Sequence, residues 1–188
     1  YNNRWEENDE ELDTNRFYID HRMKLSEAHK MRFLYEHEQD ESNYQGSFFS
    51  FKTQRDEFRF EDEWLFGSEK QHRFDTYFRY NTEKGDLARD VLEFVPYLTL
   101  QHTKRFKTIH RYGLYQYDQG GIQVTQNKFD TEAIWQATDK LTLTANGYGL
   151  HENVDHDIDT NQFGGSMDAI YHHPTSLGEL SANFNFAV

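Results

Sequence analysis

The sequence predicts an all-β protein: an antiparallel, up-and-down transmembrane β-barrel, or a fragment of a larger one. Apolar side chains recur at every second residue, as in Leu180, Ala182, Phe184 and Phe186. Such alternation gives a strand one apolar face and one polar face. The alternating runs reach about ten residues, which suits the ~9–11 residues of a tilted membrane-spanning strand. Short and long connections alternate between these runs, as expected of a chain of hairpins.

In the first half of the chain, strands are expected at 14–25, 30–38, 48–66, 72–81 and 91–102. The first strand has Phe17, Ile19 and Met23 on one side. The third has Phe58, Phe60 and Trp64 on one side, and a change of parity after Phe51 predicts an irregularity within it. The second and fourth strands show the same period in their charged residues, and the fifth lies between two turn signals.

In the second half, strands are expected at 108–117, 122–136, 140–152, 162–173 and 179–188. The eighth and ninth alternate clearly, with Leu141 and Leu143 on one and Phe163 and Met167 on the other. Short connections are expected at 26–29, 67–71, 103–106, 137–140 and 174–178. Longer polar loops, marked by Gly, Asn and Asp, are expected at 8–13, 39–46, 82–90, 118–127 and 153–161.

Composition narrows the class of protein. Of the 188 residues, 36% are hydrophobic, yet 16% are aromatic, which is unlike a disordered chain. A barrel with a wet lumen needs only half of each strand to be apolar. The net charge of −13 argues against a nucleic-acid partner, and the absence of cysteine excludes disulfides and thiolate metal sites. No apolar run approaches the length of a transmembrane helix.

The whole of residues 1–188 is expected to be a single β-barrel domain of about ten strands, incomplete at both ends. Residues 5–17 align without gaps to residues 151–163, with six identities. This internal sequence similarity predicts that one hairpin unit is used repeatedly. It also places the two ends of the chain inside strands, so we expect further strands of the same polypeptide, or another chain, to complete the barrel.

Long amphipathic strands joined by alternating short and long connections resemble bacterial outer-membrane β-barrel proteins of the porin kind. The resemblance rests on pattern over nearly the whole chain and singles out no family. It implies location in the outer membrane of a Gram-negative bacterium, with the long loops outside and the short turns in the periplasm. It also implies a pore, or the shell of a transport or export assembly, as the function. No catalytic motif is present, so no enzyme is expected.

The polar sides of the predicted strands are rich in charge and are expected to line the lumen. Both signs occur on neighbouring strands, which indicates a wide, water-filled lumen or a tight network of ion pairs. The lumen-lining candidates are Arg16, Asp20, Arg22, Arg32, Glu36, Arg59, Glu61, Arg73, Asp75 and Arg79. The candidates for contact with lipid are Leu141, Leu143, Ala145, Phe163, Met167, Leu180, Ala182 and Phe184.

The alternative is a soluble extracellular antiparallel sheet with a structural or interaction role. It draws support from His21, His37, Asp62 and Arg111, which fall on faces expected to meet lipid. A charge at the bilayer midplane costs ~2–4 kcal/mol in barrels. Asp62 is the worst placed, and a position near the interface, protonation, an assembly partner or a bulge would each relieve its cost.

Aromatic side chains gather toward the ends of the predicted strands, as in the girdles of membrane barrels. The members of this set are Tyr35, Tyr44, Trp64, Phe66, Tyr77, Tyr80, Tyr97, Tyr112, Tyr115, Tyr117, Trp135 and Tyr171.

One acidic loop is a candidate for binding metal. Asp155, Asp157 and Asp159 alternate beside two histidines, and carboxylate oxygens can hold Ca²⁺. The glycine and final glutamate of an EF-hand loop are missing, so a solvated loop remains the competing interpretation. No cofactor is expected apart from divalent cations, which could bridge acidic loops to lipopolysaccharide phosphates. The expected partners are therefore the bilayer, lipopolysaccharide and other chains or strands.

Overall fold

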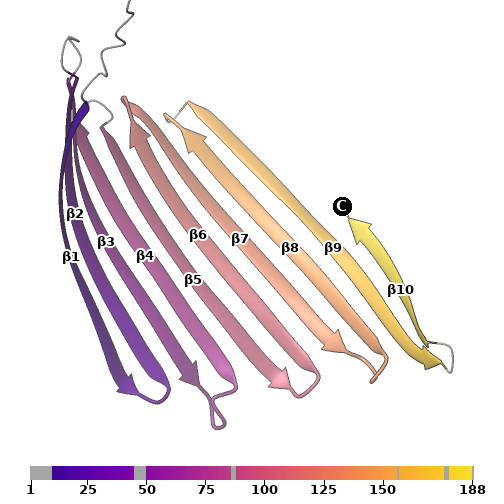
Figure 1. Ribbon diagram of the computed structural model, residues 1–188. Coiled ribbons are helices and arrows are strands. Elements are labelled where there is room, and N and C mark those ends of the chain that lie inside the picture. The colour runs from indigo at the N-terminus through magenta and orange to yellow at the C-terminus, as the bar shows by residue number, and fades with distance from the viewer. Residues whose placement is uncertain (1–9, 45–49, 86–87, 156, 176–177, 188) are drawn as a thin grey trace, which may run out of the picture.

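In the computed structural model, ten strands form one antiparallel sheet in chain order (Figure 1). The structure describes residues 10–44, 50–85, 88–155, 157–175 and 178–187, with side chains for 14–41, 52–85, 88–155 and 157–172. The strands are β1 (Glu10–Ser26), β2 (His29–Tyr44), β3 (Ser50–Phe66), β4 (His72–Gly85), β5 (Arg89–Thr103), β6 (Phe106–Gln119), β7 (Ile122–Gln136), β8 (Leu141–Val154), β9 (Ile158–Thr175) and β10 (Gly178–Ala187). The ten expected strands and their up-and-down order are confirmed.

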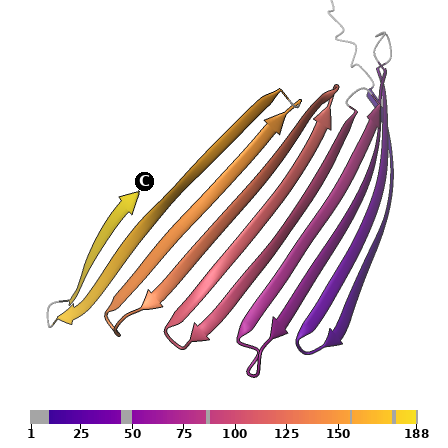
Figure 2. The same cartoon turned by 180° about the vertical axis from the view of Figure 1, so that it is seen from behind.

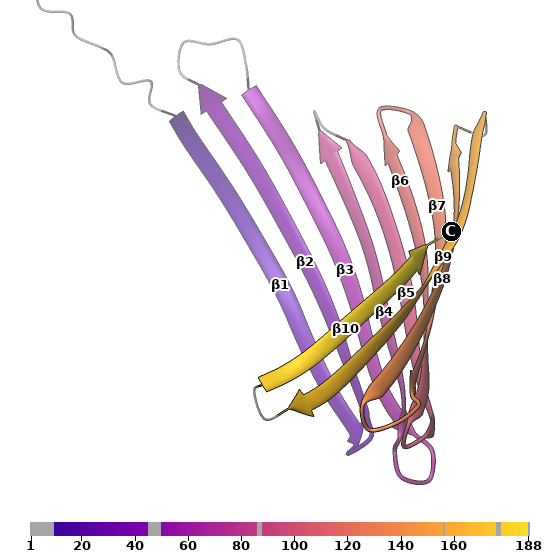
Figure 3. The ribbon, with the colours of Figure 1, turned by 90° about the vertical axis from the view of Figure 1, so that its right-hand side faces the viewer.

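Each strand pairs only with its neighbours along the chain, so every connection is a hairpin. The view from behind shows the same single layer of slanted strands (Figure 2). Seen from the side, the sheet is curved (Figure 3). Within the described residues, β1 and β10 do not pair with each other, so the sheet has two free edges. Closure into a barrel is therefore not part of the observed fold.

Most of the expected long loops are strand instead. β6 and β7 are separated only by Gly120 and Gly121, and residues 82–85 and 158–161 extend β4 and β9. The prediction failed because it took polar, acidic stretches to be loops. A strand that is polar on both faces reads in sequence as a loop. The long segment 1–9 and the tip at 45–49 lie outside the described residues.

The expected irregularity in β3 is absent. Its register with β2 is continuous from Ser50 to Trp64. The two shifts in register lie beside short turns instead, between Lys24 and Ser26 and between Gln101 and Thr103. The parity of β3 is therefore constant, and the change of pattern after Phe51 marks the point where the strand becomes polar on both sides.

Because directly paired residues point to the same side of a sheet, the register assigns every described side chain to one of two faces. The apolar face carries Phe17, Phe33, Phe60 and Leu143, whereas the polar face carries Glu57 and its neighbours in register. No other described part of the chain covers the apolar face of this single layer. Ile109 is the one buried hydrophobic residue among the described side chains. The sheet thus has no hydrophobic core of its own.

The apolar residues form a band that crosses the sheet obliquely. One row of directly paired residues shows this course. It begins with His21 on β1, is apolar on β2–β6 and becomes polar on β7–β9. Its members from β2 onward are Phe33, Phe60, Phe78, Phe94, Leu114, Asn127, His151 and Asn161. On β7–β9 the apolar residues lie nearer the short turns, in the row of Trp135, Leu143 and Ala169. The strands are therefore tilted relative to the band. No helix long and apolar enough to cross a membrane occurs among the described residues.

Candidate functional site

All ten lumen-lining candidates lie on the polar face of β1–β4. Paired residues connect them across the strands, as in the row that runs from Asp20 through Leu34 and Arg59 to Arg79. A second row joins Arg22, Arg32 and Glu61. Their spacing by two residues was the signal that found them. The sequence did not indicate which charges pair, because that depends on register.

Near the loop-side end of this face, two glutamates neutralise two arginines. Glu36 Oε1 accepts hydrogen bonds from Arg16 at 2.6 Å and from Arg55 at 3.0 Å. Arg55 also donates to Glu38 at 2.5 Å. Only 10% of the Glu36 side chain is exposed. The long arginine side chains therefore cover the carboxylate as well as neutralising it.

Glu57 is the most enclosed charge on the polar face, at 2% exposure, and it is not among the residues predicted from the sequence to line the lumen. It forms an ion pair with Arg59, and its Oε2 accepts hydrogen bonds from Arg79 at 3.1 Å and from Asn81 at 3.0 Å. Asn81 is 1% exposed. Hydrogen bonds to ionised groups are roughly twice as strong as neutral ones. This cluster, Glu57–Arg59–Arg79–Asn81, fixes two arginines at the centre of β3 and β4.

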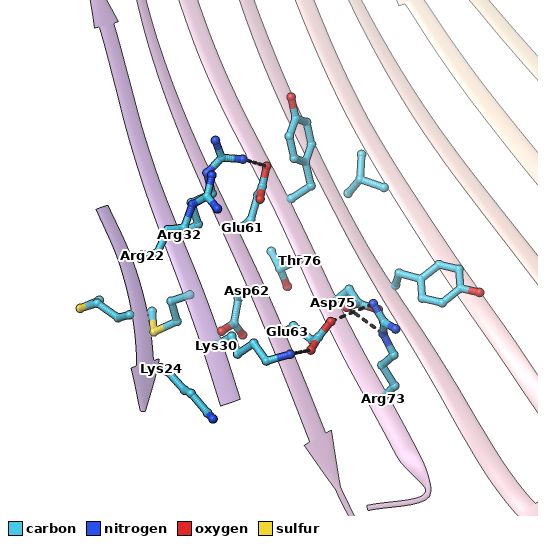
Figure 4. A pocket seen from close by; sticks show the side chains of 15 residues that line it. Arg22, Lys24, Lys30, Arg32, Glu61, Asp62, Glu63, Arg73, Asp75 and Thr76 are labelled. Carbon is cyan, nitrogen blue, oxygen red and sulfur yellow. Dashed lines mark hydrogen bonds and ion pairs between the residues drawn. The ribbon is translucent and has the colours of Figure 1, made fainter. Parts of the chain in front are cut away.

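Toward the short turns, charged residues line a groove of about 740 Å³ (Figure 4). Arg32 donates to both oxygens of Asp20, at 2.9 and 3.1 Å. Glu63 lies 2.9 Å from Lys30 and 3.1 Å from Arg73. Figure 4 shows the acidic side chains of β3 between the basic ones of β2 and β4. The groove therefore has a wall of paired charges.

The polar face of β5–β9 is less densely charged. Arg111 stacks 5.2 Å above the ring of Tyr97, and Glu132 has no charged partner among the described residues. Both line a second hollow of about 400 Å³, together with Asp130 and Tyr148. The sequence pattern predicts Arg111 on the apolar side, which is wrong, because Arg111 pairs with Tyr97 and Asp130 on the polar face.

The predicted aromatic girdle divides between the two faces. On the apolar face, Tyr35 and Tyr80 flank Phe58 in one row, and Trp64, Phe66, Trp135 and Tyr171 lie nearer the short turns. The tyrosines at 77, 97, 115 and 117 lie on the polar face instead. Proximity to a strand end did not reveal which face an aromatic side chain occupies, because alternate residues along a strand point to opposite faces. The side chain of Tyr44 lies outside the described residues.

The candidates for contact with lipid share the apolar face. Phe163 is 80% exposed and Met167 is 63% exposed, whereas Leu141, Leu143 and Ala145 are half-buried against their neighbours. In register, residues 180, 182 and 184 of β10 pair with residues 173, 171 and 169 of β9. The side chains of Leu180, Ala182 and Phe184 lie outside the described part.

Two histidine–aspartate pairs interrupt the apolar face. His29 Nε2 lies 2.7 Å from Asp62 Oδ1, and His37 Nδ1 lies 2.7 Å from Asp56 Oδ1. Tyr35 also donates to Asp56, at 2.8 Å. Asp56 lies where β3 leaves the apolar band. The sequence showed these residues but not their pairing.

The three aspartates considered as metal ligands do not form a cluster. Asp155 accepts a hydrogen bond from the backbone N–H of Gln123 at 2.7 Å, and Asp159 accepts one from Asn153 at 2.6 Å. Asp157 lies in the tight connection between β8 and β9. Across the described ranges, no group of three or more histidine, aspartate or glutamate side chains is placed to hold a metal ion.

Among the known proteins compared with this chain, one solved structure shows a weak structural likeness to it. No protein-family model matches the sequence, and no curated protein matches it. Among solved structures, the chain is similar to the translocator domain of the autotransporter NalP from Neisseria meningitidis. The TM-score is 0.31 and the identity 11%, over 95% of this chain and 75% of that one. A likeness of this size is too weak to assign a function.

Proposed function

We propose that this chain forms the wall of a β-barrel in the outer membrane of a Gram-negative bacterium. The barrel acts as a passive pore for polar solutes, or as the shell of an export assembly, and not as an enzyme. The single observation that carries the proposal is the uncovered apolar face, which extends from β1 to β9. Exposed aromatic and aliphatic side chains occupy it on β1, β7 and β9, among them Phe17, Trp135 and Phe163.

The hydrophobic effect makes such a face unstable in water. Removing apolar surface from water is worth roughly 25 cal/mol per Å², and soluble monomers rarely expose contiguous apolar patches beyond a few hundred Å². A bilayer covers the face with lipid tails and needs no second layer of protein. The oblique course of the band supports this, because strands in membrane barrels are tilted by ~35–45°.

The polar face supports the assignment of a wet lumen. Its charges are joined in ion pairs such as Arg16–Glu36 and Lys30–Glu63, with several partners more than one-third exposed. Charges of this kind remain close to water, as they would along a water-filled passage. A closed apolar core on this side would have to remove them from water at a large energetic cost.

Conductance through planar bilayers tests the pore. We expect the reconstituted protein to give stepwise currents. Because the chain lacks cysteine, a single introduced cysteine is the unique thiol. Thr144→Cys on the polar face should react with a charged methanethiosulfonate reagent and change the current, whereas Leu143→Cys, one residue away on the apolar face, should not. The lack of any current from a folded, inserted protein would exclude the open pore and leave the shell of an assembly.

A soluble sheet protein is the second candidate, and the two histidine–aspartate pairs on the apolar face favour it. That protein would need a partner layer over the whole apolar band. Failure of the folded protein to associate with detergent or lipid would decide for this candidate.

A further inference from the structure

We infer that the apolar face of β1–β3 contacts a second copy of this chain rather than lipid, around the patch of His21, His29 and Asp62. The inference rests on the proposed function, because it concerns a surface at membrane depth. The observation behind it is an ionisable pair in the middle of the apolar band.

Asp62 lies at the centre of the apolar stretch of β3. Phe58 and Phe60 precede it on the same face, and Trp64 and Phe66 follow it. Asp62 is therefore not at the edge of the band, which excludes an interfacial position. Its carboxylate is held by His29 at 2.7 Å, and 14% of the side chain is exposed.

Ionisable side chains at membrane depth are rare, and they almost always face protein or a water-filled cavity. In the row of Asp62, Met31 and then Met23 lie on the β1 side and Thr76 lies on the β4 side, while His29 is paired with Trp64. Methionine side chains are flexible and adapt to irregular partner surfaces. A paired carboxylate with two methionines on one side and a threonine on the other thus suits contact with protein better than contact with lipid tails.

The patch is complementary to itself, which identifies the partner as a second copy. His21 has no hydrogen-bond or ion-pair partner among the described residues and is exposed. One strand, β2, lies between β1 and β3, and His21 lies in the row of paired residues next to that of Asp62. With a strand spacing of ~4.8 Å and a rise of ~3.4 Å per residue, the two residues of one chain are about 12 Å apart. In a two-fold contact, His21 of one copy can approach Asp62 of the other, and the reciprocal contact forms at the same time.

The described side chains of β6–β9 form no such patch on the apolar face. On β6 and β7, His110 bonds only to the hydroxyl groups of Thr108 and Thr131. On β9, Met167 and Phe163 are highly exposed and carry no charge. These strands suit lipid, so β6–β9 provide an internal control for β1–β3.

Spin labels on matched methionine positions test the inference in the full chain reconstituted in lipid nanodiscs. Met31→Cys places the label in the patch, and Met167→Cys places it on the same face of β9. We expect the label at 31 to be several-fold less accessible to oxygen than the label at 167, with dipolar coupling between two labels at 31 and none at 167. Lipid contact at both positions without coupling would overturn the inference and leave the proposed function intact. Loss of lipid contact at 167 would overturn the proposed function itself.

A pair of variants tests the patch chemistry without relying on a label. The double variant Asp62→Leu/His29→Leu removes both partners together and leaves no unpaired charge, so the sheet should still fold. Native mass spectrometry should find two copies for the unaltered protein and for the control His110→Leu, and one copy for the double variant. A dimer that survives the double substitution, or a monomer of the unaltered protein, would contradict the inference.

Discussion

Single residues on the polar face differ in how much their charge contributes to stability, because they differ in enclosure. Glu57 is almost completely covered and contacts Arg59, Arg79 and Asn81. Glu41, in contrast, is 43% exposed and meets Lys52 at 3.3 Å. Water therefore screens the Glu41–Lys52 pair more strongly than the enclosed carboxylate of Glu57. The same residue type should therefore give very different effects when it is neutralised.

We expect Glu57→Gln to lower the free energy of unfolding by about 3–5 kcal/mol, because it leaves two arginines without their shared carboxylate. Glu41→Gln should cost less than about 1 kcal/mol, as do most exposed pairs. Urea unfolding in lipid vesicles measures both. Equal effects of the two substitutions would show that enclosure does not control the strength of these pairs.

At the scale of the element, the strands are longer than the apolar band they carry. β4 and β6 continue as polar hairpins beyond it, and glycine allows their tight ends. Gly85 has φ of +115°, and a Cβ there would lie 2.0 Å from the carbonyl oxygen of Lys52. Gly120 and Gly121 have φ of +62° and +84° with open space around them. Positive φ at both residues is what a two-residue hairpin of type I′ requires.

Substitutions at Gly85 and Gly120 should distinguish two reasons for glycine: a steric clash with a neighbouring strand at Gly85 and a left-handed backbone conformation at Gly120. Gly85→Ala should open the end of the β3–β4 ladder, because alanine clashes with the backbone of Lys52. Gly120→Asn should leave the fold unchanged, since asparagine tolerates a left-handed conformation. Hydrogen exchange of the β3 and β4 amides reads out the difference. Normal protection of both strands in Gly85→Ala would contradict the geometry.

The two ends of the hairpins should lie on opposite sides of the membrane. An epitope inserted between Gly120 and Gly121 should be detected by antibody on intact cells. The same epitope inserted between Lys104 and Arg105, in the short turn at the other end of β6, should be detected only after permeabilisation. Detection of both insertions on intact cells would contradict a membrane-spanning β6.

The sequence predicted the strands and short turns because both follow from local rules: alternation with period two, and turn residues between the runs. It did not predict the strand extensions at 82–85 and 158–161, because a strand with two wet faces has no alternation. It placed the charges on one face but could not pair Glu57 with Arg79 or Asp62 with His29. Those contacts depend on the register between strands, which no local pattern encodes.

At the scale of the whole molecule, a membrane location requires that the free edges of β1 and β10 be paired with other strands. An unpaired backbone group in lipid costs several kcal/mol, so both edges should be paired when the protein is in a membrane. We expect consecutive amides along residues 14–25 of β1 to be protected from hydrogen exchange in nanodiscs. Rapid exchange at every second residue would show an open edge and would contradict this expectation.

The central claim is that one face of the sheet meets lipid and the other meets water. A nitroxide scan through residues 141–150 of β8 tests it most directly, with one cysteine at a time in a chain that has none. Accessibility to oxygen should peak at the odd positions, such as 141, 143 and 145, which share the apolar face. Accessibility to a water-soluble nickel complex should peak at the even positions, such as 142, 144 and 146. Odd positions that neither reagent reaches would show that the apolar face is buried in a protein core, and the membrane account would be wrong.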